Sequence, residues 1–184
     1  MRVLGISGSL RRDSHNTRLL AYAGRLLPPG AQLELYEDLK AVPPYDADDD
    51  VEPAPPAVAR LRAAIADADA VLIATPEYNG SISGVLKNAL DWASRPRTGS
   101  PLRFKPVAVV GASTGAFGAV WAQAELRKVL GAMGGRVIEA ELPVAHAADL
   151  RHGDRLELPP EQAERLEEIL AELVAATERE LAAA

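Results

Sequence analysis

Three stretches of the chain consist mostly of apolar residues, at positions 2–7, 70–74 and 106–111. None alternates apolar with polar side chains, so each predicts a β-strand that is covered on both faces. Residues 31–36 do alternate, and residues 136–140 form a shorter and less apolar run. We expect the first of these to be a further strand and the second to be a strand at an edge of the sheet.

Between these stretches, apolar residues recur at spacings of three and four, which is the period of a helix with one buried face. The pattern predicts five helices. They span residues 16–27, 56–67, 83–94, the stretch from the end of a Gly-rich loop at Gly118 to about Leu130, and residues 160–181.

Strands and helices therefore alternate along the chain, which predicts a parallel sheet with helices on both faces. Five such units in 184 residues fit one flavodoxin-like α/β domain over residues 1–184, with the doubly wound strand order 2-1-3-4-5. A six-stranded Rossmann order is the alternative, but the chain is short for it.

Two segments show neither the strand pattern nor the helical pattern. Residues 42–56 are rich in Pro, Asp and Glu, and the run from Asp46 to Asp50 has no apolar anchors. We expect a solvated, mobile loop there, because nothing closes it into a metal site with fixed ligand distances. Tyr45, beside two prolines, is expected to pack over a neighbouring site or a partner subunit. Residues 143–158 are also predicted to form a loop.

Composition narrows the function. A net charge of −6 argues against a nucleic-acid surface, and the absence of cysteine excludes disulfides, thiolate metal sites and cysteine nucleophiles. The three histidines have no metal-ligand spacing. No apolar run approaches the roughly 20 residues that span a membrane, and no signal peptide is recognisable, so we expect a cytoplasmic location.

Polar and Gly-rich loops follow three of the predicted strands, at residues 7–17, 75–81 and 112–118. In the proposed strand order these three strands are neighbours. Ligands of doubly wound sheets bind outside the carboxyl ends of the strands, where the strand order reverses. The sequence therefore predicts one ligand site that is built from all three loops.

The first loop lies between a strand and a helix N-terminus, where free N–H groups and the helix dipole favour a phosphate. Gly8 allows close approach of the backbone, and Arg11 adds a cationic fork. Short polar side chains offer further hydrogen bonds, namely those of Ser9, Ser14, Asn16 and Thr17. The alternative is that these residues only form a turn and a helix cap.

Other phosphate and nucleophile motifs are missing. The first loop lacks the G-x-G-x-x-G of dinucleotide-binding folds and the Gly-Lys-Ser/Thr of a Walker A loop. Strands 1 and 3 do not end in the acidic residues of a phospho-receiver. Gly5-Ile6-Ser7-Gly8 is not the G-x-S-x-G of a serine hydrolase.

Three motifs occur in order between residue 2 and about residue 146. They are Gly8-Ser9-Leu10-Arg11-x-x-Ser14-x-Asn16, Thr75-Pro76-Glu77-Tyr78-Asn79-Gly80-Ser81 and Leu86-Lys87-Asn88-Ala89-Leu90-Asp91-Trp92. Together they resemble the NADPH-dependent FMN reductase family, which includes bacterial quinone and chromate reductases and related azoreductases.

The resemblance implies where an FMN cofactor is held. The phosphate is implied to contact Ser9, Arg11, Ser14, Asn16 and Thr17. The ring and ribityl chain are implied to lie against Pro76, Glu77, Tyr78, Asn79 and Gly80, with Ser81 near the phosphate. The pyrimidine end of the flavin is implied to meet Ser113, Thr114 and Gly115.

The resemblance also implies NADPH or NADH as co-substrate, a small-molecule electron acceptor, and a homodimer or homotetramer built with the third helix. Asp91 and Trp92 on that helix are expected to be packing or interface residues. No catalytic side chain is expected, because the flavin carries the hydride chemistry, so Glu77 is not assigned as a base. Tyr78 either stacks on the ring or belongs to a turn. Arg127 is expected to be solvated rather than to bind NADPH.

The first hypothesis is an enzyme that passes a hydride from NAD(P)H through FMN to a quinone, azo compound, metal oxyanion or free flavin by a ping-pong mechanism. The second is a flavodoxin-type electron carrier that binds FMN without NAD(P)H activity of its own. The third is a homologue that has lost the flavin, against which the intact first loop argues.

Overall fold

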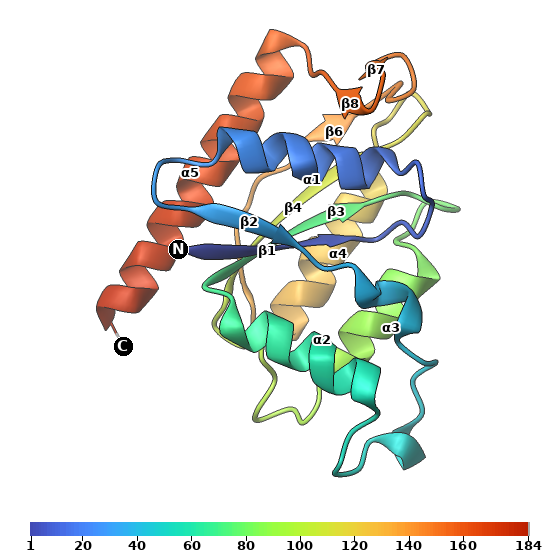
Figure 1. The fold of residues 1–184 in the computed structure, drawn as a ribbon, viewed down its shortest axis with the longest axis vertical. Helices are drawn as coiled ribbons and strands as arrows, with labels where there is room; N and C mark the ends of the chain where they lie inside the picture. Colours follow the sequence, from blue (N-terminus) through green and yellow to red (C-terminus); the bar gives the residue numbers. More distant parts are fainter. Residues whose placement is uncertain (184) are drawn as a thin grey trace.

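A parallel sheet with the strand order β2-β1-β3-β4-β5 forms the centre of the protein (Figure 1). The structure, a computed structural model, describes residues 1–183. The strands are β1 (Arg2–Ser7), β2 (Gln32–Leu35), β3 (Ala70–Thr75), β4 (Pro106–Ala112) and β5 (Arg136–Val137). All residues of β3 and β4 are buried, as their continuous apolar runs require. The predicted flavodoxin-like order is confirmed.

Helices cover both faces of the sheet, so the protein has two core layers (Figure 1). The helices are α1 (His15–Leu26), α2 (Pro56–Asp67), α3 (Gly84–Ala93), α4 (Val120–Ala132) and α5 (Pro160–Ala183). Helices α2, α3 and α4 bury one face, whereas α1 and α5 bury the other. Successive residues of β3 serve opposite cores, with Ile73 in the first and Leu72 in the second, because strand side chains alternate in direction. Among residues 1–183, no helix is long and apolar enough to cross a membrane.

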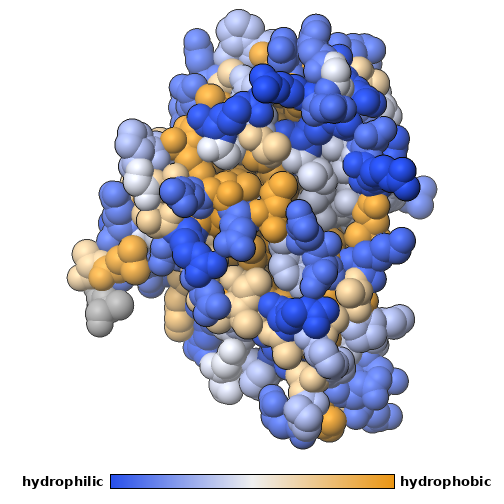
Figure 2. Space-filling view, in the orientation of Figure 1, coloured by the Kyte–Doolittle hydropathy of each residue, from blue (hydrophilic) through white to orange (hydrophobic). Residues whose placement is uncertain are grey.

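The β2 edge of the sheet is open and partly apolar. Figure 2 shows an apolar area in the middle of this face, and a groove of about 820 Å³ there is lined by residues that include Leu33 and Leu35. The strand has only four residues, and Glu34 at its centre pairs with Arg2 of β1 at 3.1 Å. A short edge that carries charge is a poor template for pairing with another chain.

The far edge of the sheet differs from the prediction. Strand β5 has two residues instead of the predicted 136–140, and the predicted loop 143–158 contains three short strands. One of them, β6 (Pro143–Val144), pairs in parallel with the end of β4, which extends beyond β5. The prediction of a plain loop was wrong because two-residue strands are too short to show a period.

The acidic segment 42–56 is exposed over much of its length, as predicted, but Asp50 anchors it to a helix. One short 3₁₀ turn, η1 (Asp38–Ala41), lies just before the segment, and another, η2 (Ala47–Asp49), lies within it. Asp50 forms an ion pair with Arg62 of α2 at 2.7 Å, and both side chains are mostly buried. The sequence did not indicate this anchor because the partner of Asp50 lies on another element.

Trp92 of α3 holds the start of the same segment against the core. Its side chain is fully buried, and Nε1 donates to the backbone oxygen of Pro43 at 2.9 Å. Tyr45 packs edge-on against the Trp92 ring, with centroids 4.9 Å apart. Trp92 is therefore a packing residue, and Tyr45 packs on its ring.

Arg127 of α4 is not solvated, contrary to expectation. Its side chain is 17% exposed, and Nη2 lies 3.0 Å from a carboxylate oxygen of Glu141. Nη1 donates to the backbone oxygen of Ala140 at 3.3 Å. The guanidinium thus holds the segment that leads into β6.

Gln123 and Gly118 connect α4 to the same segment. Gln123 is fully buried, accepts from the N–H of Leu142 at 3.0 Å and donates to the backbone oxygen of Gly118 at 3.2 Å. Gly118 has φ +58°, and a Cβ built there would lie 2.4 Å from the carbonyl carbon of Pro143. Only glycine lets the loop before α4 pass so close to β6.

We expect Gly118→Ala to lower the free energy of unfolding by roughly 3 kcal/mol, because it adds a backbone clash to left-handed strain. The midpoint of thermal unfolding should fall by roughly 6–12 °C. Circular dichroism melting of the two proteins measures the difference.

Gly153→Ala is the matched control. Its φ is +60°, but a Cβ there has nothing within 4 Å. We expect it to lose only about 1 kcal/mol, from backbone strain alone. Equal losses in the two variants would contradict the role of the close approach.

Candidate functional site

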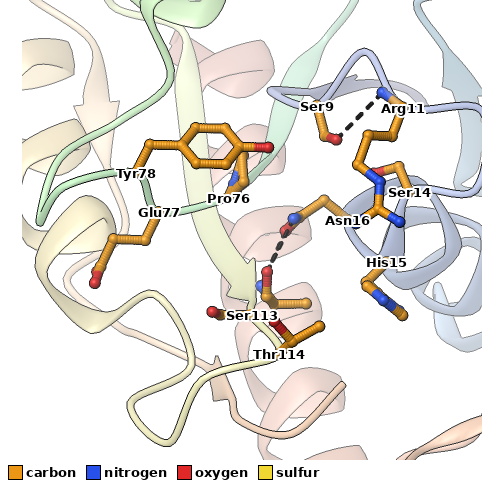
Figure 3. Close-up of a pocket in the computed structure, with 11 residues that line it drawn as sticks. Ser9, Arg11, Ser14, His15, Asn16, Pro76, Glu77, Tyr78, Ser113 and Thr114 are labelled. Carbon is orange, nitrogen blue, oxygen red and sulfur yellow. Dashed lines mark hydrogen bonds between the residues drawn. The ribbon is translucent and has the colours of Figure 1, made fainter. Parts of the chain in front are cut away.

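The loops after β1, β3 and β4 meet around a cavity of about 100 Å³ (Figure 3). The first loop and the start of α1 contribute Ser9, Arg11, Ser14, His15 and Asn16. The second loop contributes Pro76, Glu77 and Tyr78. The end of β4 and the third loop contribute Ala112, Ser113 and Thr114. The structure thus brings the three loops together, although only part of each lines the cavity.

The N-terminus of α1 forms one wall of the cavity. Ser14 is the N-cap, and its buried Oγ accepts from the N–H of Thr17 at 3.2 Å. The Thr17 hydroxyl in turn donates to Ser7 Oγ at 2.9 Å. The N–H groups of His15 and Asn16 have no acceptor within the helix. Ser14 and Thr17 therefore shape the loop, and Thr17 does not line the cavity.

Asn16 joins the first loop to the end of β4. Its Nδ2 donates to the backbone oxygen of Ala112 at 3.0 Å, and its Oδ1 accepts from the Ala112 N–H at 2.9 Å. The side chain is buried. Its amide is thus used within the protein, and the group of Asn16 that remains for a ligand is the backbone N–H.

His15 also lines the cavity, and sequence reasoning missed it. Its Nδ1 is buried without a hydrogen-bond partner, and so is Nη1 of Arg18 one turn along the helix. Burial, followed by the charges of Arg11, Arg18 and Arg151, lowers the pKa of His15, so the imidazole is neutral at pH 7. The only signal for His15 in the sequence was its place between Ser14 and Asn16.

This wall fits an anionic group. It combines helix N–H groups that lack intrahelical acceptors, the positive end of the helix dipole and the guanidinium of Arg11. The residues present therefore suit a phosphate ester.

The second loop closes on itself beyond Tyr78. Tyr78 and Ser81 exchange backbone hydrogen bonds of 3.0 and 3.1 Å. Between them, Asn79 and Gly80 have φ of +55° and +73°, as in a two-residue hairpin turn. Asn79, Gly80 and Ser81 therefore lie in the turn and do not line the cavity, whereas Tyr78 lines the cavity and is 52% exposed as a residue.

Glu77 has a structural partner. Its Oε2 accepts from the N–H of Ala122 at 3.0 Å, in the first turn of α4. The N-cap of that helix, Ala119, has no side chain that can cap it. Glu77 supplies the missing cap from another loop, so its carboxylate lies against the positive end of the helix dipole.

The third loop is fixed by the chain that follows β6. Gly115 donates to Ser113 Oγ at 3.1 Å, and its backbone oxygen accepts from the N–H of His146 at 3.1 Å. Ser113 also exchanges backbone hydrogen bonds with this segment, to Val144 and from Ala147. Ser113 and Thr114 line the cavity, but Gly115 lies beyond the lining.

Comparison with known proteins is consistent with this arrangement. Residues 1–149 match the family model described as NADPH-dependent FMN reductase. An NAD(P)H-dependent FMN reductase of Pseudomonas aeruginosa is 52% identical over 130 residues, which cover 71% of this chain and 69% of that protein. A 2-hydroxy-1,4-benzoquinone reductase of a Burkholderia species is 46% identical over 130 residues, which cover 70% of this chain and 69% of that protein.

A solved structure is similar over nearly the full length. The flavoenzyme NAD(P)H:(acceptor) oxidoreductase FerB of Paracoccus denitrificans superposes with a TM-score of 0.84 at 34% identity, and 97% of each chain is covered. A WrbA-like flavodoxin of Agrobacterium tumefaciens, at 18% identity and a TM-score of 0.59, shares the fold. The family match covers well over half of the chain and includes all three loops around the cavity. The chain belongs to the NADPH-dependent FMN reductase family.

Proposed function

We propose that this protein is an FMN-dependent reductase that takes a hydride from NADPH or NADH and delivers it to a quinone or a similar small acceptor. The observation that carries the proposal is the cavity at the N-terminus of α1, with its anion-binding wall next to the exposed Tyr78 ring. The family membership and the quinone reductases among its relatives support the same function.

We assign the FMN phosphate to the wall formed by the first loop. Arg11 supplies charge, Ser9 supplies its hydroxyl, and His15 and Asn16 supply backbone N–H groups. The flavin ring is assigned to Pro76 and Tyr78, and its pyrimidine end to Ser113 and Thr114. The other expected site residues are assigned to building these loops, because their polar groups bond within the protein or lie outside the cavity lining. They are Ser14, Thr17, Glu77, Asn79, Gly80, Ser81 and Gly115.

These assignments give FMN and the protein different roles in the reaction. Bound FMN supplies the hydride chemistry, and the protein supplies position and electrostatics. The Glu77 carboxylate caps α4, so Glu77 is assigned no role as an acid or a base in the reaction. The Tyr78 side of the cavity is exposed, so NAD(P)H and the acceptor are proposed to use the same face in turn.

We also propose a homodimer or homotetramer, with residues 1–184 as one FMN-binding domain in each subunit. Phe117 and Trp121 form an exposed aromatic pair, 62% and 51% exposed, with ring centroids 4.8 Å apart. Exposed apolar groups of this size are typical of contact surfaces. This pair, rather than the buried Trp92, is the proposed contact. The cytoplasm, where reduced nicotinamide cofactors are available, is the proposed location.

We expect Arg11→Ala to raise the dissociation constant of FMN roughly ten- to a hundred-fold, because the phosphate loses a charge-assisted hydrogen bond worth about 1.5–3 kcal/mol. Quenching of flavin fluorescence by the flavin-free protein measures the constant. Arg12→Ala is the control, because the neighbouring arginine does not line the cavity. Equal effects of the two substitutions would remove Arg11 from the site.

Initial rates measured with varied NADPH and varied quinone should give parallel double-reciprocal lines, because both substrates use one face in turn. Lines that intersect would instead indicate a ternary complex. If the purified protein holds FMN but oxidises no NADPH or NADH with a quinone present, the electron-carrier hypothesis replaces this one.

A further inference from the structure

A small hairpin beyond the family match lies against the helix that forms the phosphate wall. Strands β7 (Arg151–His152) and β8 (Arg155–Leu156) pair antiparallel, and the family match ends at residue 149. Leu156 is buried in the same core layer as Leu19 and Leu20 of α1. Helix α1 and β8 are in contact, so the buried leucine anchors the hairpin beside the helix.

Asp13 connects the hairpin to the first loop. Its carboxylate oxygens lie 3.0 Å from Nη2 of Arg18 in α1 and 3.8 Å from Nη1 of Arg151 in β7. Arg18 also donates from Nε to the backbone oxygen of Asp154, in the hairpin turn, at 3.2 Å. The Arg18 side chain is only 11% exposed, so a largely buried guanidinium joins loop, helix and hairpin.

Asp13 can pair with both arginines because its carboxyl group is ionised. The hydrogen bond from Arg18, followed by the charge of Arg151, lowers the pKa of the Asp13 carboxyl. The carboxylate is therefore charged at neutral pH, and both arginines have a fixed partner in the loop.

The loop has few other fixed points at this place. Within the described part of the chain, the other hydrogen bond that holds residues 10–13 runs from the Arg11 N–H to Ser9 Oγ, at a long 3.4 Å. Asp13 stands between Arg11 and Ser14, which both line the cavity. A shift of Asp13 would therefore shift both of these neighbours.

The same residues set the charge of the wall. The positive charges of Arg11, Arg18 and Arg151 all act on His15. The negative charge of Asp13 acts in the opposite direction. Around His15 these three arginines outnumber the one aspartate, so the charge at this wall is positive. A phosphate monoester carries about −1.5 to −2 at pH 7, so the two charges are complementary.

We propose that the β7–β8 hairpin holds the phosphate loop in its binding conformation, with Asp13 and Arg151 as positioning residues, and that this contact strengthens the preference for FMN over riboflavin that the loop's phosphate-binding groups provide. The inference rests on the proposed placement of the FMN phosphate at this loop. It extends the site to a segment beyond the residues that match the family.

A positional role and a purely electrostatic role predict opposite signs for one substitution. Asp13→Asn makes the wall more positive, so electrostatics alone would tighten FMN binding. If Asp13 positions the loop, the same substitution weakens FMN binding. Riboflavin lacks the phosphate, so its affinity reports on the rest of the site.

The experiment titrates flavin-free protein with FMN and with riboflavin and follows flavin fluorescence. We expect Asp13→Asn to raise the FMN dissociation constant roughly ten-fold and Arg151→Gln roughly three-fold. The riboflavin constant should stay within about two-fold in both variants. The double variant should fall short of the product of the single effects, because both break one contact.

Arg155→Gln is the control, because Arg155 is an exposed arginine of the same hairpin and forms no ion pair among residues 1–183. It should change neither constant. Unchanged or tighter FMN binding by Asp13→Asn would overturn the positioning role, and so would a parallel loss of riboflavin affinity. If the unmodified protein does not prefer FMN to riboflavin, the proposed phosphate site fails, and the inference fails with it.

Discussion

The paired hydrogen bonds between Asn16 and Ala112 are the constraint on which the site depends. They connect the start of α1 to the end of β4, two segments 96 positions apart in the chain. Both groups are buried, and a buried amide that loses its partner costs about 1–3 kcal/mol. The pairing therefore fixes the anion-binding end of α1 relative to the end of β4, from which the third loop starts.

A second lesson concerns the polar residues of the loops. Ser14, Thr17, Glu77 and Ser83 would all suit contacts with a ligand, yet each bonds to another part of the protein. Ser83 caps α3 and donates to the backbone oxygen of Gly8 at 2.6 Å, just as Glu77 caps α4. Polar side chains in these loops serve first to satisfy helix ends and neighbouring backbone, and the backbone groups of α1 that lack acceptors then face the ligand.

The sequence was sufficient for those parts of the fold that depend on periodic burial. The apolar runs of β3 and β4 and the helical stripes specify a doubly wound sheet, and from that sheet the meeting of the three loops follows. The sequence was not sufficient where a partner comes from a distant element. The ion pairs of Asp50 and Arg127, the pairing of β6 with β4, and the cavity position of His15 are all of this kind. A family motif marks which loop matters, but it does not separate the residues that touch a ligand from those that support the loop.

The self-closed turn from Tyr78 to Ser81 has a consequence for how such proteins diversify. Its hydrogen bonds run between its own two ends, so the tip at Asn79 and Gly80 adds nothing to the sheet or the cores. Residues can be inserted or exchanged at that tip while Pro76 and Glu77 keep their places. The tip next to the cavity rim can therefore grow or change in evolution or by engineering, and so alter what approaches the cavity, at little cost to the stability of the fold.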